Sequence, residues 1–176
     1  MAGSLIKIDE EIVSSAVSNV TLTGIDSTYD VYIVKLNNVT TASDNKDLYM
    51  QYIKASDSST DNTANYDYAS KGLLSSASFQ NNTNTNQTQF IIQYARGSAT
   101  NEQDNNVLYL FNTFSSSEFS FLTIEGSGLN FNGALGSEQG GGVHTVAQSN
   151  SGVKFTWESA GNFNSGNFVL YGLKKA

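Results

Sequence analysis

The sequence predicts an all-β fold: an antiparallel β-sandwich that is jelly-roll-like and has about ten strands. Three observations lead to this prediction. Apolar residues alternate with polar ones along most runs, no long segment has a convincing helical period, and turn-forming residues recur roughly every ten to fifteen positions. No internal repeat of fixed length occurs, which disfavours a propeller or a solenoid.

The composition indicates one folded domain. The 176 residues suit a single core of ordinary size, and ten phenylalanines and nine tyrosines supply apolar area that disordered chains lack. Only 14% of the residues are charged, so solubility comes mainly from neutral polar groups. We expect residues 17–176 to form one β-sandwich domain, preceded by an N-terminal arm over residues 1–16.

The arm is separated from the domain because its apolar residues do not follow the alternating pattern. Charged residues interrupt them, so neither a short helix nor a short strand is clearly favoured. Branched apolar residues in this position indicate docking on another surface, rather than the disorder that is common at chain ends. The residues expected to contact a neighbouring subunit or a shell are Leu5, Ile6, Ile8 and Ile12.

The first half of the domain is expected to begin with a hairpin. Its second strand, residues 29–37, carries apolar residues on both faces and is therefore expected to be covered on both sides. The polar runs 56–65 and 81–88 are expected to be exposed loops. The strands expected in this half are residues 17–23, 29–37, 48–53 and 66–68.

The second half of the domain continues the strand pattern. Residues 126–142 contain a Gly-Ser-Gly sequence and a triple glycine, and they are expected to be mostly turn, mobile at the triple glycine, with a short strand at 129–131. A turn ending in Gly152 is expected to join two strands as a hairpin. The strands expected in this half are residues 90–94, 107–111, 119–124, 143–147 and 153–157.

The last strand of the chain is expected to be central in its sheet. Phe168 and Leu170 point to one face and Val169 and Tyr171 to the other, since side chains alternate along a strand, so both faces are apolar. The core residues expected around this strand are Trp157, Phe163, Phe168, Leu170 and Tyr171.

Two short motifs stand at opposite ends of the chain. Residues 161–163 read GNF, a Gly/Ser turn follows, and residues 170–173 read LYGL, while residues 20–32 contain the run LTGIDSTY at 22–29. The first motif resembles the C-terminal signature, and the second the first strand pair, of a family of structural proteins from tailed bacteriophages, especially marine and cyanobacterial ones. The middle of the chain is only loosely alike.

The resemblance implies a non-enzymatic structural protein of the virion, assembled in the host cytoplasm. A capsid decoration or cement protein, which stabilises the shell through symmetric contacts, is the first expectation. Its partners would be other copies of itself and the major capsid protein or other virion proteins. The alternative is a tail or tail-fibre component that binds the host surface or a glycan.

Charge and cysteine content exclude several partners. The formal net charge of −7, with nine scattered Lys and Arg residues, argues against nucleic acid, because phosphate neutralisation needs clustered cations. No apolar run is long enough for a membrane span, and no secretion signal is expected at the N-terminus. The absence of cysteine rules out disulfides and thiolate metal sites, and it fits assembly in a reducing cytosol.

The residues that could carry catalysis or bind a metal are few. His144 is the only histidine, and we expect it to face solvent on a strand, because a zinc site or a Ser-His-Asp triad would need partners that the sequence does not place nearby. Asp57, Asp61 and Asp67 could collect around calcium, but their spacing does not match an EF-hand. We therefore expect no cofactor and no bound metal.

Two further groups have alternative roles. Carboxylates could pair for glycoside cleavage, but they are expected to face water, so the chain is not expected to be an enzyme. Aromatic residues could stack on sugars, as in a lectin, although aromatics at strand positions are more often core. The carboxylates are Glu118, Glu125, Glu138 and Glu158, and the aromatic residues are Tyr66, Tyr68, Tyr94 and Trp157.

The sequence also favours self-association. It has no proline and little lysine to protect the edges of its sheets, so exposed edges would pair with other chains unless an assembly covers them. Asn-rich loops are the other means of covering them. We expect a homotrimer, because threefold positions are available on a capsid and closed cyclic symmetry is usual for identical chains.

Overall fold

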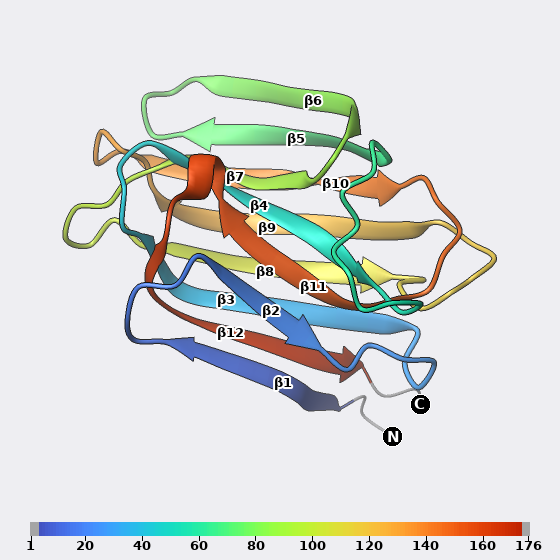
Figure 1. Cartoon of the computed structure of the whole chain (residues 1–176). Helices are drawn as coiled ribbons and strands as arrows, with labels where there is room; N and C mark the ends of the chain where they lie inside the picture. The colour runs from blue at the N-terminus through green and yellow to red at the C-terminus, as the bar shows by residue number, and fades with distance from the viewer. Residues whose placement is uncertain (1–3, 174–176) are drawn as a thin grey trace.

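Two antiparallel sheets, one of eight strands and one of four, pack face to face and leave the sandwich open at its edges (Figure 1). This computed structural model describes residues 4–173. The predicted all-β sandwich is confirmed, with twelve strands in the described residues where about ten were expected. The only helical element there is the short 3₁₀ turn η1, Glu158–Ala160.

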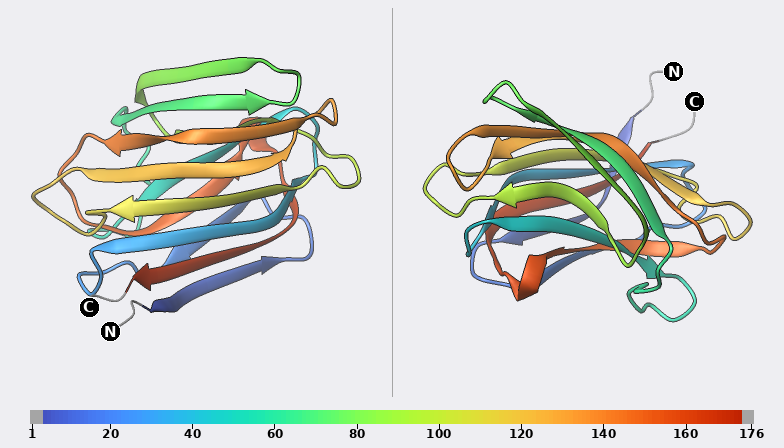
Figure 2. Two further views of the ribbon diagram at one scale, coloured as in Figure 1. Left: turned by 180° about the vertical axis from the view of Figure 1, so that it is seen from behind. Right: turned by 90° about the horizontal axis from the view of Figure 1, so that it is seen from above.

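The larger sheet is seen from its outer face in the left view of Figure 2. In spatial order, its strands are β1 (Leu5–Val13), β12 (Phe163–Leu173), β3 (Val31–Thr41), β8 (Asp104–Phe111), β9 (Ser120–Leu129), β10 (Leu135–His144), β5 (Tyr66–Leu74) and β6 (Phe79–Gln87). The strands of the smaller sheet, also in spatial order, are β2 (Asn19–Thr23), β11 (Asn150–Trp157), β4 (Lys46–Lys54) and β7 (Phe90–Arg96).

The connectivity is that of a jelly roll with two insertions. Without the insertions, the chain alternates between the two sheets from β1 to β4 and again from β7 to β12, and β4 and β7 both lie in the smaller sheet. The strands pair as β1 with β12, β2 with β11, β3 with β8 and β4 with β7. These are the nested pairs of an eight-stranded jelly roll. Strands β5 and β6 and strands β9 and β10 are insertions, and they extend only the larger sheet.

The core lies between the sheets and is rich in aromatic residues. One cluster surrounds Phe90, whose ring centroid lies 4.8 Å from that of Tyr66 and 6.1 Å from that of Tyr52. A second cluster surrounds Phe163, whose centroid lies 5.3 Å from that of Phe168 and 5.5 Å from that of Trp157. The inner faces of both sheets are thereby held together by large apolar side chains.

The terminal strand β12 lies between β1 and β3 and pairs antiparallel with both (Figure 1). Phe168 and Leu170 on this strand have no solvent exposure, and Val169 on the opposite face is also buried. Tyr171 is half-buried. The last strand of the chain is therefore an interior strand of the larger sheet.

The segment expected to be an arm belongs to the sheet. Residues 5–13 form the edge strand β1, in register with β12 from the pair Leu5 and Leu173 to the pair Val13 and Gly166. Its irregular pattern has a physical cause: the register shifts at Ile8, where a bulge directs this side chain against the core. A bulge breaks the period of two, so the sequence pattern did not identify the strand.

Two other segments were expected to be loop or turn and are strands. Residues 79–87 form β6, a polar strand held by its pairing with β5. The triple glycine lies within β10, which pairs on both sides, so it is not a mobile turn. A Cβ atom at Gly140 would lie 2.4 Å from the carbonyl oxygen of Ala69, and one at Gly142 would lie 2.5 Å from the ring of Phe90. These glycines allow close packing rather than a reversal of the chain.

Replacing Phe168 by alanine tests how much β12 contributes to the stability of the fold. Phe168 is fully buried and contacts the rings of Phe155 and Phe163, so we expect Phe168→Ala to lower the free energy of unfolding by about 3–5 kcal/mol. Urea denaturation followed by fluorescence measures this loss. Leu173→Ala on the same strand, where the side chain is 37% exposed, is the control and should cost far less. Equal losses for the two variants would contradict the assignment.

Candidate functional site

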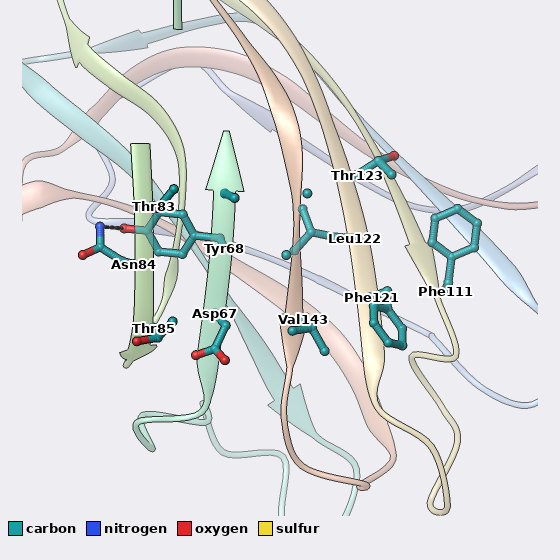
Figure 3. A pocket seen from close by; sticks show the side chains of 13 residues that line it. Asp67, Tyr68, Thr83, Asn84, Thr85, Phe111, Phe121, Leu122, Thr123 and Val143 are labelled. Atoms are coloured by element: carbon teal, nitrogen blue, oxygen red, sulfur yellow. Dashed lines mark hydrogen bonds between the residues drawn. The ribbon is translucent and has the colours of Figure 1, made fainter. Parts of the chain in front are cut away.

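A groove of about 840 Å³ lies on the outer face of the larger sheet, over the part that the insertions add. Its lining comes from β8, β9, β10, β5 and β6, and Figure 3 shows the side chains that surround it. It faces away from the smaller sheet, because most of its lining residues have side chains that point out of the sandwich. On β9, for example, Phe121 and Thr123 are exposed, whereas Leu122, which also borders the groove, is buried.

Strand register brings the lining residues together in two rows across the sheet. In the first row, Phe111 on β8 is paired with Phe121 on β9, Phe121 with Val143 on β10, and Val143 with Asp67 on β5. The second row contains Thr123, Gly141, Ala69 and Thr83, paired in the same way from β9 to β6. Residues that are far apart in the sequence therefore become neighbours on one surface.

The two sides of the groove differ in chemistry. Phe111 and Phe121 form an aromatic side, and Thr83, Thr85 and Asp67 form a polar side across a floor of small residues (Figure 3). One oxygen of Asp67, Oδ1, accepts a hydrogen bond of 2.7 Å from the backbone N–H of Asn86, which fixes this carboxylate beside β6. No lysine or arginine is among the described residues that line the groove. This lining is therefore amphipathic and carries no positive charge of its own.

The expected contact residues of the arm are on the outer edge of the same sheet. Ile12 is 68% exposed, and Leu5 and Ile6 are also exposed, whereas Ile8 turns inward against the core. Among residues 4–173, β1 pairs only with β12, so it is an edge strand whose other side faces away from the sheet. The predicted set thus divides into three exposed residues and one that packs within its own domain.

His144 was expected to face solvent, and this expectation is wrong. The side chain has no exposed surface, because its position on β10 points toward the interior of the sandwich. Its Nε2 atom lies 3.1 Å from Oδ2 of Asp61, and its ring centroid lies 4.6 Å from that of Tyr66. Burial lowers the pKa of His144, and the nearby Asp61 carboxylate offsets this only in part. The neutral imidazole is therefore the form that the fold favours.

Asp61 is held by a set of donors and is not available as a calcium ligand. Its Oδ1 accepts hydrogen bonds from the backbone and hydroxyl of Thr63, and Oδ2 accepts one of 2.7 Å from Gln148. Burial opposes ionisation, but these hydrogen bonds outweigh it and lower the pKa of Asp61. Asp57 is exposed at a turn and Asp67 is in the groove, so the structure does not bring the three aspartates together.

A second buried polar network lies where β7 faces the inserted strands. Nε of Arg96 is 3.4 Å from Oδ1 of Asp104, and the same guanidinium donates a hydrogen bond to Oε1 of Gln93. Burial raises the pKa of Asp104 to about 7, against the opposing effect of Arg96. A Cβ atom at Gly126 or Gly128 would overlap this network. The Gly-Ser-Gly sequence therefore makes room for buried polar side chains.

The carboxylates considered for glycoside cleavage are scattered, and the aromatic residues considered for sugar stacking belong mostly to the core. Glu138 was expected to face water but is buried; its Oε2 accepts a hydrogen bond of 2.8 Å from Ser70, and burial raises its pKa. Glu118 and Glu125 are exposed and Glu158 is half-exposed. The aromatic residues considered for sugar stacking are buried or partly buried in the core: Tyr66, Tyr68, Tyr94 and Trp157.

Sequence reasoning did not identify the aromatic side of the groove. Phe111 was assigned to a strand expected to be buried on both faces and Phe121 to the strand that follows it, and nothing in a single strand indicates that the two residues are paired on an outer face. The one available signal was that both faces of these strands carry apolar residues. A second face that is apolar and has no covering sheet indicates a binding surface.

Comparison of the chain with protein-family models, curated proteins and solved structures gave no match. Within residues 4–173, no group of three or more His, Asp or Glu side chains is arranged to hold a metal ion. None of the helical structure in this range is long or apolar enough to cross a membrane.

The buried histidine predicts a pH dependence of stability. The folded-state pKa of His144 lies below its ordinary value of 6.5, so as the pH falls through 6.5 the unfolded chain takes up a proton that the folded protein does not. We expect the free energy of unfolding of the wild type to decrease over this range relative to that of His144→Gln. Urea denaturation of both proteins above and below pH 6.5 measures the difference. Parallel pH profiles would contradict this prediction.

Proposed function

We propose that this protein is a non-enzymatic structural protein of a tailed-phage virion, and specifically a capsid decoration or cement protein. The observation that carries the proposal is β1, which is an edge strand among the described residues 4–173 and has exposed Leu5, Ile6 and Ile12. The resemblance of residues 22–29 and of the terminal GNF and LYGL motifs to phage structural proteins supports the same reading.

The edge is suited to contact with another protein. An exposed edge strand offers a row of backbone donors and acceptors, and proteins that remain monomeric usually protect such edges. Here the middle of β1 is charged, and Lys7 and Glu10 form a surface ion pair of 2.7 Å. The exposed apolar side chains are at its two ends. A partner that covers both ends would bury apolar area and complete the backbone pairing.

The placement of the polar groups supports a non-enzymatic role. A triad or a zinc site would depend on His144, which is enclosed in the core beside Tyr52 and Tyr66. Asp104 and Arg96 are likewise enclosed, and each serves a network inside the sandwich. These groups stabilise the fold in places that a substrate does not reach.

A second candidate function is a tail or tail-fibre component that binds the host surface. The groove on the outer face favours this candidate, because it is an open binding surface that a purely cementing role does not require. The two functions place the protein at different parts of the particle. Imaging of labelled particles separates them, since a cement protein gives density across the shell and a fibre component gives density only at the tail.

Substitutions on β1 test the decoration role. We expect the double variant Leu5→Ser with Ile12→Ser to fold normally, because both side chains are exposed, and to bind shells assembled without this protein at much lower occupancy. Phe79→Ser is the matched control, because Phe79 is also 68% exposed but lies on β6 at the opposite edge. Quantitative gels of sedimented particles measure occupancy. Unchanged occupancy of the double variant would refute a role for β1.

The proposed partners are other copies of the chain and the major capsid protein. We expect a homotrimer, in which a closed ring of identical contacts matches the threefold positions of a shell. In solution, light scattering should give three times the chain mass, and on the particle the protein should lie on threefold or quasi-threefold axes. A monomer bound away from every symmetry axis would refute the trimer and leave the decoration role intact.

A further inference from the structure

We infer that the groove on the outer face of β8, β9, β10, β5 and β6 binds a neutral oligosaccharide. This function goes beyond decoration and does not depend on it, because the groove and β1 lie on separate parts of the larger sheet. The inference depends on the shape of the groove, the chemistry of its two sides and its lack of positive charge.

The groove has the size and the openness that an extended ligand needs. Its volume of about 840 Å³ is within the range of about 300–1,000 Å³ that is usual for small-molecule sites. It crosses five strands, and since neighbouring strands are about 4.8 Å apart, it is about 19 Å wide across the sheet. The floor residues Ala69 and Thr123 are exposed along it. A short chain of sugar rings fits such a surface better than a single ring that needs enclosure.

The aromatic side offers a stacking platform. Phe111 and Phe121 are direct cross-strand partners, so their side chains stand side by side at one end of the groove (Figure 3). Phe121 is 46% exposed, which leaves a large apolar surface in contact with water. The face of an aromatic ring carries partial negative charge and is apolar, so it attracts the C–H face of a sugar ring. Stacking would cover the exposed ring and orient the sugar across the sheet.

The polar side offers the hydrogen bonds that sugar hydroxyls need. Thr83 and Thr85 on β6 each have a hydroxyl that both donates and accepts, and both residues are exposed. Across the floor, the Asp67 carboxylate is held by the N–H of Asn86 and can accept further donors through its two oxygens. A carboxylate that accepts from two adjacent hydroxyls fixes a sugar ring strongly, because its hydrogen bonds are charge-assisted.

The charge of the groove selects against anionic ligands. Among the described residues, its lining contains one carboxylate and no lysine or arginine, on a protein with a formal net charge of −7. Lys71 is on the same face two residues beyond Ala69, but it lies over the ring of Phe79 and outside the lining. The balance of charge therefore disfavours sulfated or uronic polysaccharides, phosphates and nucleic acids. A neutral sugar chain, by contrast, needs only hydroxyl partners and an apolar platform, and the groove has both.

The position of the groove within the sheet argues against an extended peptide. Strands β9, β10 and β5 are each paired on both sides, so their backbone groups are already bonded. A peptide that adds to a sheet needs a free edge, and the floor of the groove has none. Recognition on this floor therefore depends on side chains, as it commonly does for sugars, and of the described strands that line the groove only β6, at its rim, is an edge strand.

Titration of the full-length protein with neutral oligosaccharides tests the inference. The probes are gluco-, manno-, galacto- and N-acetylglucosamine-based series from disaccharides to hexasaccharides, followed by calorimetry and by NMR shifts of the groove residues. We expect at least one series to bind, with affinity that increases with chain length. Dextran sulfate, added as an anionic probe, should not bind.

Matched variants tie the binding to the groove. Phe121→Ala should raise the dissociation constant of the tightest-binding oligosaccharide about tenfold, because it removes the stacking platform. Phe119→Ala is the control: it removes a phenylalanine of similar exposure, 43%, that precedes the same strand and does not line the groove. Its affinity should match that of the wild type. Ala69→Trp, which fills the floor from an exposed position, should abolish binding, and thermal melting checks that each variant is folded.

Several results would overturn the inference. These are failure of every neutral series to bind, binding of dextran sulfate alone, and an unchanged affinity in folded Phe121→Ala. A self-association of the free protein that Phe121→Ala abolishes would assign the groove to a second copy of the chain instead. The variants on β1 keep this test separate from decoration, because loss of shell binding with retained sugar binding, or the reverse, identifies which proposal has failed.

Discussion

The pairing of β12 with β1 and β3 is the constraint on which the rest of the structure depends. It joins the two ends of the chain, because Leu5 is the partner of Leu173, and it places the fully buried Phe168 and Leu170 beneath the smaller sheet. The other strand pairs of the jelly roll are nested, in sequence, inside the pair of β1 and β12. The pairing of β1 with β12 also joins the segments that are farthest apart in the sequence. The entropy cost of closing this long loop must therefore be met before packing of the core can stabilise the pairing.

The insertions that extend the larger sheet explain both the buried polar groups and the groove. Strands β9, β10 and β5 lie beyond the nested pairs of the jelly roll, and their inner faces are covered by Phe90 together with the His144 and Arg96 networks. Buried charges stabilise little by themselves, because desolvation offsets their attraction, but removing one partner is costly. We expect the His144 and Arg96 networks to favour one specific arrangement of the core at this end of the sandwich. The outer face of the same strands remains free of any covering sheet.

The two proposed functions use different parts of one sheet and are compatible. The proposed assembly would use the edge at β1, the first strand in the spatial order, whereas the proposed sugar binding would use the face that ends at β6, the last strand. A subunit attached through β1 would leave the groove accessible on the far part of the sheet. Attachment of several copies would then repeat weak sugar sites on one particle, and repetition raises the effective affinity of each site.

The sequence by itself determined the fold class, most strands and the interior position of the last strand, because alternating apolar residues indicate a strand with one buried face and apolar residues on both faces indicate a covered strand. It did not predict β1, β6 or the strand role of the triple glycine. A bulge at Ile8 breaks the alternation, β6 is almost wholly polar, and the glycines of β10 are required by Phe90 and Ala69 on other strands. His144 and the pair Phe111 and Phe121 depend on register in the same way. Which residues meet across strands is set by long-range pairing, so only the tertiary structure decided the buried histidine and the groove.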